Sequence, residues 1–207
     1  ACSPKLQSVT SKDTRSGEGV VIVQTLEQVK PALPVRISVV LDGSKDMTEF
    51  FPEIARAFDG FPSMPETSVW FAQDGVSKIF DSTLASRDSH SAALAKLRGG
   101  GGQDGLPALL EAWEWAAAKP GSVLLWIHGP QPVLFAGTEP LRQRLERQGS
   151  SEGPRILDVL TRSGPNRITE QLGTLNAFTA LPRLGELRDD LERLFAFWSG
   201  GRAEFRL

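Results

Sequence analysis

Residues 35 to 47 read Val-Arg-Ile-Ser-Val-Val-Leu-Asp-Gly-Ser-Lys-Asp-Met, an apolar run followed at once by polar residues. The run from Val35 to Leu41 is rich in β-branched residues, which is typical of a strand covered by helices on both faces. Asp42, Ser44 and Asp46 follow it at alternate positions, where the strand stops and a helix is expected to start. Ligands bind at this carboxyl end of the strands in open parallel sheets. The stretch therefore predicts a parallel sheet with a candidate site at its edge.

Strands and helices are expected to alternate along the rest of the chain, which predicts an α/β fold with a doubly wound, mostly parallel central sheet of about six strands. Asp74-Gly75 between two apolar runs is a strong hairpin signal, so one antiparallel edge strand is expected. The predicted strands are Val20 to Thr25, Val35 to Leu41, Thr67 to Gln73, Val76 to Phe80, Ser122 to Ile127, Ile156 to Leu160 and Ala177 to Leu181. The predicted helices are Met47 to Phe58, Ser89 to Leu97, Leu106 to Lys119, Pro140 to Gln148, Pro165 to Leu172 and Leu184 to Trp198.

The 207 residues are enough for one domain with a substantial core. We expect a flexible lead-in over residues 1 to 18, one α/β domain over residues 19 to 200 and a tail over residues 201 to 207. A net charge of -2 argues against a nucleic-acid binder. No segment is apolar enough to insert into a membrane. Ala1-Cys2-Ser3-Pro4 looks like a bacterial lipoprotein just after its lipidated cysteine, but an incidental cysteine is favoured.

The motif after the first core strand resembles the von Willebrand factor type A domain, whose metal-ion-dependent adhesion site (MIDAS) opens with Asp-x-Ser-x-Ser. Asp42 and Ser44 match this motif, and Asp46 stands where the second serine is expected. The family completes its site with a threonine on a glycine-rich loop and an aspartate after the next core strand. Gln103 and His128 occupy those two positions here. The resemblance thus implies the type A framework with an incomplete metal site.

The candidate metal ligands are Asp42, Ser44, Asp46, Gln103 and His128. Magnesium prefers six hard oxygen ligands, whereas imidazole favours transition metals. We therefore expect either no cofactor or one divalent transition metal held by Asp42, Asp46 and His128. Asp46 has an alternative role, because its carboxylate can cap the helix expected to begin at Met47.

The resemblance implies a non-enzymatic protein-interaction or adhesion module within a larger bacterial protein or assembly. In such domains an acidic group of the partner completes the coordination of the metal. With the motif incomplete, we expect a protein partner to contact the loops around Asp42, Gln103, Asp104 and His128. A location outside the cytoplasm, or tethered to a membrane through a larger chain, is slightly favoured.

The alternative function is a metal-dependent phosphatase of the haloacid-dehalogenase type with Asp42 as nucleophile. Those enzymes carry a second aspartate two residues later as the acid and base, and Ser44 cannot shuttle protons in that way. A Ser-His-Asp site built on His128 lacks a nucleophile at a defined spacing.

Two further features have structural and functional interpretations. The glycines from Gly99 to Gly102 favour a flexible turn over a phosphate cradle, because no Gly-Lys-Ser/Thr follows them. Trp113 and Trp198 are expected in the core, whereas Trp115 and Phe197 are expected on the opposite faces of their helices, where exposed aromatic residues are typical of interfaces.

Overall fold

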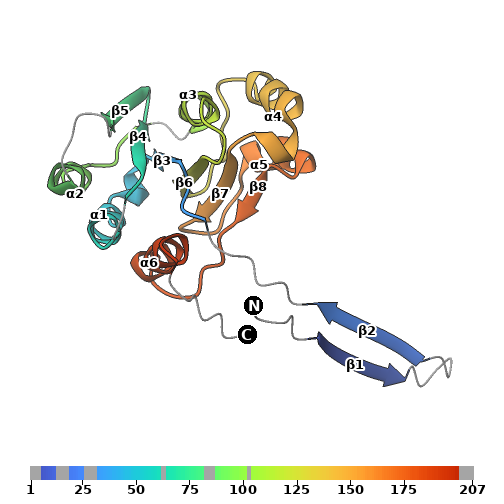
Figure 1. The fold of residues 1–207 in the computed structure, drawn as a ribbon. Helices are drawn as coiled ribbons and strands as arrows, with labels where there is room; N and C mark the ends of the chain where they lie inside the picture. Colours follow the sequence, from blue (N-terminus) through green and yellow to red (C-terminus); the bar gives the residue numbers. More distant parts are fainter. Residues whose placement is uncertain are drawn as a thin grey trace. The chain divides into compact units, whose positions relative to one another are not determined.

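The computed structural model describes residues 6–12, 19–25, 32–61, 64–81, 87–101 and 104–200 (Figure 1). The chain divides into two compact units, Ala1–Pro31 and Ala32–Leu207. The division therefore falls between Pro31 and Ala32, and not at the boundary expected after residue 18.

The first unit contains a two-stranded antiparallel sheet. Strand β1 (Leu6–Lys12) pairs with β2 (Gly19–Thr25), in a register that places Leu6 opposite Thr25 and Lys12 opposite Gly19. Val20 to Thr25 forms a strand as predicted, but in this separate sheet, where it pairs with residues that were expected to be a flexible lead-in. Polar residues dominate β1, so its sequence gives no strand signal.

The second unit is built on a six-stranded sheet with the order β5-β4-β3-β6-β7-β8. All neighbouring strands are parallel except β4 and β5, whose antiparallel pairing follows from the Asp74-Gly75 turn. This confirms the predicted α/β fold with its single antiparallel edge strand. The strands are β3 (Arg36–Asp42), β4 (Glu66–Ala72), β5 (Val76–Asp81), β6 (Val123–His128), β7 (Arg155–Leu160) and β8 (Phe178–Ala180).

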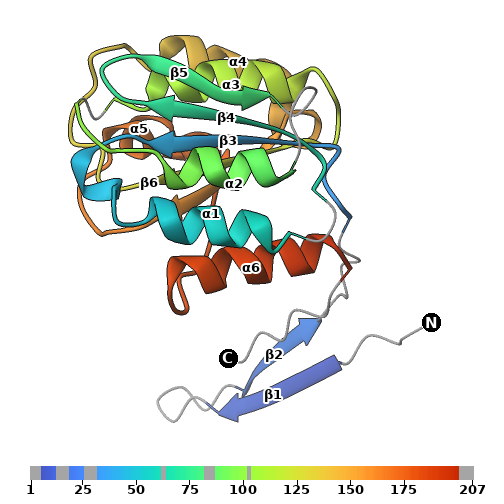
Figure 2. The ribbon, with the colours of Figure 1, turned by 90° about the vertical axis from the view of Figure 1, so that its left-hand side faces the viewer.

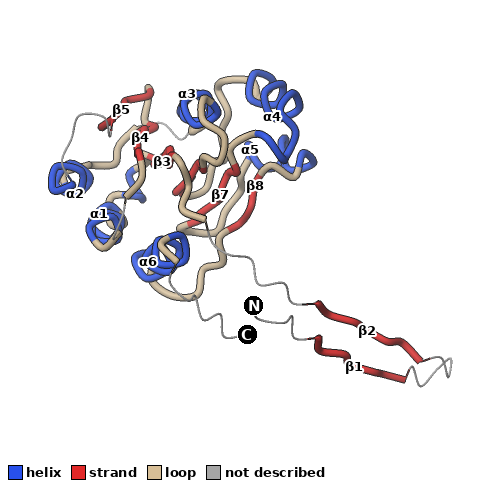
Figure 3. Tube along the Cα trace, viewed as in Figure 1, coloured by secondary structure: helices blue, strands red, loops and turns tan. Residues whose placement is uncertain are grey.

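Helices cover both faces of this sheet, as Figures 2 and 3 show. One face packs against α1 (Phe51–Asp59), α2 (Arg87–Ala95) and α6 (Leu187–Trp198). The other face packs against α3 (Leu106–Ala117), α4 (Glu139–Glu152) and α5 (Arg167–Leu172), and a short 3-10 turn (Gly173–Leu175) follows α5.

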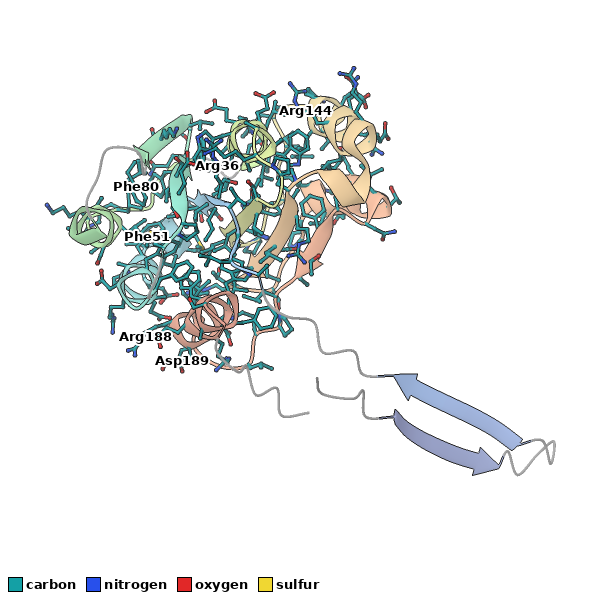
Figure 4. All side chains as sticks on the ribbon, in the orientation of Figure 1. Arg36, Phe51, Phe80, Arg144, Arg188 and Asp189 are labelled. Atoms are coloured by element: carbon teal, nitrogen blue, oxygen red, sulfur yellow. The ribbon has the colours of Figure 1, made fainter. Side chains whose placement is uncertain are left out.

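The central strand β3 contributes side chains to both layers. Ile37, Val39 and Leu41 belong to the core under α1 and α6, whereas Val40 belongs to the core under α3. The side chains fill the space between sheet and helices (Figure 4), where the Phe51 and Phe71 rings meet edge to face with their centroids 5.5 Å apart. A strand that is apolar on both faces is thus what the β-branched run predicts.

Three helices begin later than the sequence predicts, and one of them is α5, which starts at Arg167 and not at Pro165. Lys45–Met47 forms a 3-10 turn instead of the first turn of a helix, and α1 starts at Phe51. The closing helix starts at Leu187 and not at Leu184, because the backbone of Glu186 is extended, with φ -66° and ψ 151°. The backbone N–H of Leu184 donates to the Asp190 carboxylate at 3.1 Å.

The four aromatic residues singled out in the sequence are all at least partly covered. Trp113 and Trp198 lie in the core as predicted. The prediction of an outward-facing Trp115 was wrong, since its ring packs against Trp70 with centroids 5.6 Å apart and lies 4.5 Å below the Arg36 guanidinium. Phe197 is half-buried against the α6 side of the core.

Candidate functional site

The ends of the two central parallel strands bring the predicted residues Asp42 and His128 to the same edge of the sheet. Leu41 pairs with Ile127, so Asp42 and His128 end neighbouring strands. Both side chains are buried, with 2% and 0% of their surface exposed. The site is therefore at the edge where the strand order predicts it, but it lies below the surface.

Asp42 accepts hydrogen bonds on both carboxylate oxygens. Oδ1 accepts from the backbone N–H of Ser44 at 2.8 Å. Oδ2 accepts from the backbone N–H of Gly129 at 3.0 Å and from the side-chain amide Nε2 of Gln131 at 3.1 Å. Each oxygen of this buried carboxylate thus has at least one N–H donor within the chain.

Gln131 is the central residue that sequence analysis missed. Its Nε2 donates to Asp42, and its Oε1 accepts from the backbone N–H of Gly105 at 3.0 Å, just before α3. Its backbone N–H donates to the Pro165 carbonyl and its carbonyl accepts from the Arg167 N–H, at 2.8 and 2.9 Å. One fully buried residue thus joins the end of β3 and the start of α3 through its side chain, and the start of α5 through its backbone.

His128 is turned away from the Asp42 carboxylate. Its Nε2 lies 2.7 Å from Asp158 Oδ1 on β7, and its Nδ1 lies 2.6 Å from the Gly129 carbonyl oxygen. Its ring stacks on Trp126, with centroids 3.6 Å apart. Both ring nitrogens already have oxygen partners, so neither is directed at a metal ion that Asp42 could share.

Ser44 and Asp46 lie in the turn that follows β3. Ser44 is buried and contacts Asp42 through its backbone N–H. The Asp46 side chain is 72% exposed and lies 3.8 Å from the Arg162 guanidinium, which also contacts Glu49. The capping role suggested for Asp46 was wrong, because α1 begins at Phe51 without any side-chain cap.

Gln103 lies outside the described residues. Its neighbour Asp104 holds two segments together: Oδ1 accepts from the N–H of Leu106 at 3.0 Å. Oδ2 accepts from the N–H groups of Phe135 and Ala136 at 2.9 and 3.0 Å. Asp104 therefore orders the loop between β6 and α4 at the start of α3.

The glycine segment packs its backbone against the Asp42 turn. The Gly100 N–H donates to the Gly43 carbonyl at 2.8 Å, and the Gly99 N–H donates to Thr48 Oγ1 at 3.0 Å. A Cβ on Gly99 would lie 2.1 Å from the Ser44 carbonyl oxygen. Gly99 thus permits a close backbone approach, and both N–H groups are already used.

Among the described residues no group of three or more His, Cys, Asp and Glu side chains is placed to hold a metal ion. Asp42 and His128 share one edge of the sheet, but the Asp42 carboxylate accepts from N–H groups and His128 pairs with Asp158. Among the described helices, none combines the length and apolar character of a membrane span.

Neither protein-family models nor curated protein sequences match this chain. Several solved structures, in contrast, are similar to this chain. The second unit is similar to a von Willebrand factor type A protein from Catenulispora acidiphila, with a TM-score of 0.54 and 13% identity over 86% of this chain and 44% of that one. Proximal thread matrix protein 1 from the mussel byssus, solved with a zinc-occupied MIDAS motif, gives a TM-score of 0.52 and 13% identity over 82% of this chain and 48% of that one.

The PilB minor pilin from Streptococcus sanguinis is similar over 93% of this chain and 76% of the pilin, with a TM-score of 0.50 and 8% identity. At such low identities the similarity establishes the fold alone. The chain has the von Willebrand factor type A fold, as its first motif predicts, and it spans less than half the length of the first two structures, 44% and 48%.

Proposed function

We propose that this chain is a protein-binding module of the type A kind, part of a larger bacterial protein or assembly, that binds its partner without a metal ion. One observation carries the proposal. Asp42, the first acidic residue of the adhesion motif, has both carboxylate oxygens occupied by donors from Ser44, Gly129 and Gln131. The neutral amide of Gln131 thus donates a hydrogen bond to the carboxylate that would face a cation in an intact site.

The contact surface in this proposal is the set of loops at the carboxyl end of the sheet. Asp104 joins the loop after β6 to the start of α3, and Gln131 joins it to the end of β3. Loops on a rigid scaffold are the usual place for binding residues. The similarity to a byssus matrix protein and a minor pilin supports a role in contacts between proteins and a location outside the cytoplasm.

The phosphatase alternative has no support in the geometry. A nucleophilic carboxylate needs an oxygen directed at the phosphorus atom, and Asp42 is 2% exposed with each oxygen hydrogen-bonded within the chain. We expect no turnover of a generic phosphate ester with magnesium. Turnover that Asp42→Asn abolishes would revive this alternative.

The metal-free part of the proposal is tested by calorimetric titration with magnesium, manganese and zinc at two pH values. We expect no stoichiometric binding by the wild-type protein. Tight magnesium binding that survives His128→Ala would contradict the proposal, because it would require oxygen ligands other than those identified here.

The binding surface is tested by selecting peptides from a displayed random library on the immobilised protein, in EDTA. We expect binders whose addition shifts the amide NMR signals of Gly129, Phe135 and Ala136. Binders that map only to the α1 and α6 face, or that need a divalent ion, would contradict the proposal.

A further inference from the structure

A hollow of about 410 Å³ opens beside the Asp42 network. Three segments form its walls: the turn between β4 and β5, the start of α3, and the loop that Asp104 fixes. Gln73, on the hollow's wall, donates through Nε2 to the Gly100 carbonyl at 2.8 Å, so the hollow adjoins the glycine segment. Its lining includes Asp74, Val76, Asp104, Pro107, Phe135 and Ala136.

Phe135 presents its ring to solvent from a fixed backbone. Its side chain is 82% exposed, the largest fraction among the large apolar residues that the structure describes. Nevertheless its N–H and that of Ala136 are both bonded to Asp104. Exposure of an aromatic ring to water is unfavourable in free energy, so covering the ring favours binding. Because the backbone of Phe135 is already ordered, little conformational entropy is lost when a partner covers the ring. Phe135 is therefore suited to anchor a bound group.

The negative charge of the residues that line the hollow favours a positively charged ligand. Two of the residues that line it are carboxylates, Asp74 and Asp104, and none of the lining residues is basic. Asp104 keeps its backbone partners, but its negative charge still contributes to the local potential. The remaining walls near Phe135 are apolar, formed by Val76, Pro107 and Ala136. The hollow thus combines negative charge, aliphatic surface and an aromatic face.

Arginine matches this combination better than any other side chain. Its methylene stem packs on apolar surface, its planar guanidinium pairs with carboxylates, and it stacks on aromatic rings. We propose that the hollow receives an arginine side chain of the partner protein, with the stem along Val76 and Pro107, the guanidinium near Asp74 and its plane against Phe135. This rests on the proposed function and gives the partner's contact the opposite charge from the acidic group that the type A resemblance implies.

The test uses two synthetic peptides, acetyl-Gly-Arg-Gly-amide and the same peptide with citrulline, which has nearly the same shape without the charge. Each is titrated into the isotopically labelled protein and followed by amide NMR signals. We expect saturable, weak binding of the arginine peptide, with shifts at Gly75, Phe135 and Ala136, and much weaker binding of the citrulline peptide. Phe135→Ala and Asp74→Asn should each weaken binding about two- to fivefold.

Matched control variants distinguish binding in the hollow from non-specific binding to exposed apolar or charged side chains. Leu184→Ala removes another exposed apolar side chain, 61% exposed and outside the hollow, and Asp189→Asn removes an exposed charge on α6. Neither should change the affinity. Equal affinity for both peptides, or equal losses in the control variants, would overturn the proposal.

The outcome also separates this site from the proposed function. Library peptides that bind the same loops but lack arginine, with no binding of the arginine peptide, would overturn the arginine site and leave the protein-binding module standing. Library peptides that bind elsewhere, while the arginine peptide still shifts Phe135 and Ala136, would support the hollow and contradict the wider loop surface.

Discussion

Gln131→Glu tests whether the buried amide stands in for a cation. The substitution keeps the shape of the side chain but replaces the Nε2 donor, 3.1 Å from Asp42 Oδ2, by an acceptor oxygen. A hydrogen bond to a carboxylate is worth about 1.5–3 kcal/mol. Two unit charges at 3.1 Å repel by about 5 kcal/mol at an effective dielectric constant of about 20. The free energy of unfolding should therefore fall by up to about 8 kcal/mol when both groups are charged.

The pH dependence of the stability of the Gln131→Glu variant follows from a proton that the new carboxyl group and Asp42 can share. The acid pair binds a proton more tightly when folded than when unfolded, so the loss should be largest at alkaline pH and shrink as the pH falls. Divalent ions should also restore stability, because the facing carboxylates offer hard oxygen ligands, and an ion at a hundred times its dissociation constant adds about 2.7 kcal/mol.

Urea denaturation followed by tryptophan fluorescence measures these effects, with EDTA or manganese present, at acidic and mildly alkaline pH. Gln131→Met is the matched control: it loses the bond to Asp42 and leaves the Gly105 N–H unpaired, so it should be destabilised by about 3–6 kcal/mol without any response to manganese. The reasoning is refuted if manganese stabilises the wild-type protein as much as the Gln131→Glu variant, since the native site would then hold an ion itself.

Two further predictions concern stability away from this network. Burial alone would raise the pKa of Asp190, but hydrogen bonds from Arg183, the Leu184 N–H and Arg193 lower it below its ordinary value. The stabilisation by Asp190 is thus present above the unfolded pKa and is lost as the pH falls through the folded pKa. Asp190→Asn should lower the free energy of unfolding by about 3–5 kcal/mol near neutral pH. It should also weaken the dependence of that free energy on pH in the acidic range. Gly99→Ala should lower the thermal midpoint strongly, because its Cβ would lie 2.1 Å from the Ser44 carbonyl oxygen, whereas Gly75→Ala, with no atom within 4 Å, should change it little.

The parts of the fold that local patterns determine were predicted from sequence. The β-branched run of β3 gives a strand buried on both faces, and the Asp74-Gly75 turn gives the antiparallel edge. The lead-in was mistaken because β1 is polar and its pairing with β2 depends on neither propensity nor periodicity. The start of α6 was mistaken because the backbone of Glu186 is extended, a conformation that the apolar stripe cannot reveal.

The placement of Asp42 and His128 at one edge of the sheet could be predicted from the sequence, but their contacts could not. The strand ends gave Asp42 and the segment at His128, because parallel strands share one edge. The sequence could not show that His128 faces Asp158, 30 residues later, or that Gln131 reaches back to Asp42. A glutamine three residues after a strand has no distinctive pattern, and its role depends on the three segments that converge on it.

The sequence distance between Asp42 and Gln131 has a consequence for how the domain folds. These residues lie 89 positions apart, and Gly129 lies 87 from Asp42, whereas β3 and β4 are separated in sequence only by the segment that contains α1. The carboxylate can therefore remain hydrated while β3, β4 and β5 associate, and it loses its water only when β6 docks. Interactions completed this late are weak or absent in the folding transition state, so the network acts mainly by slowing unfolding.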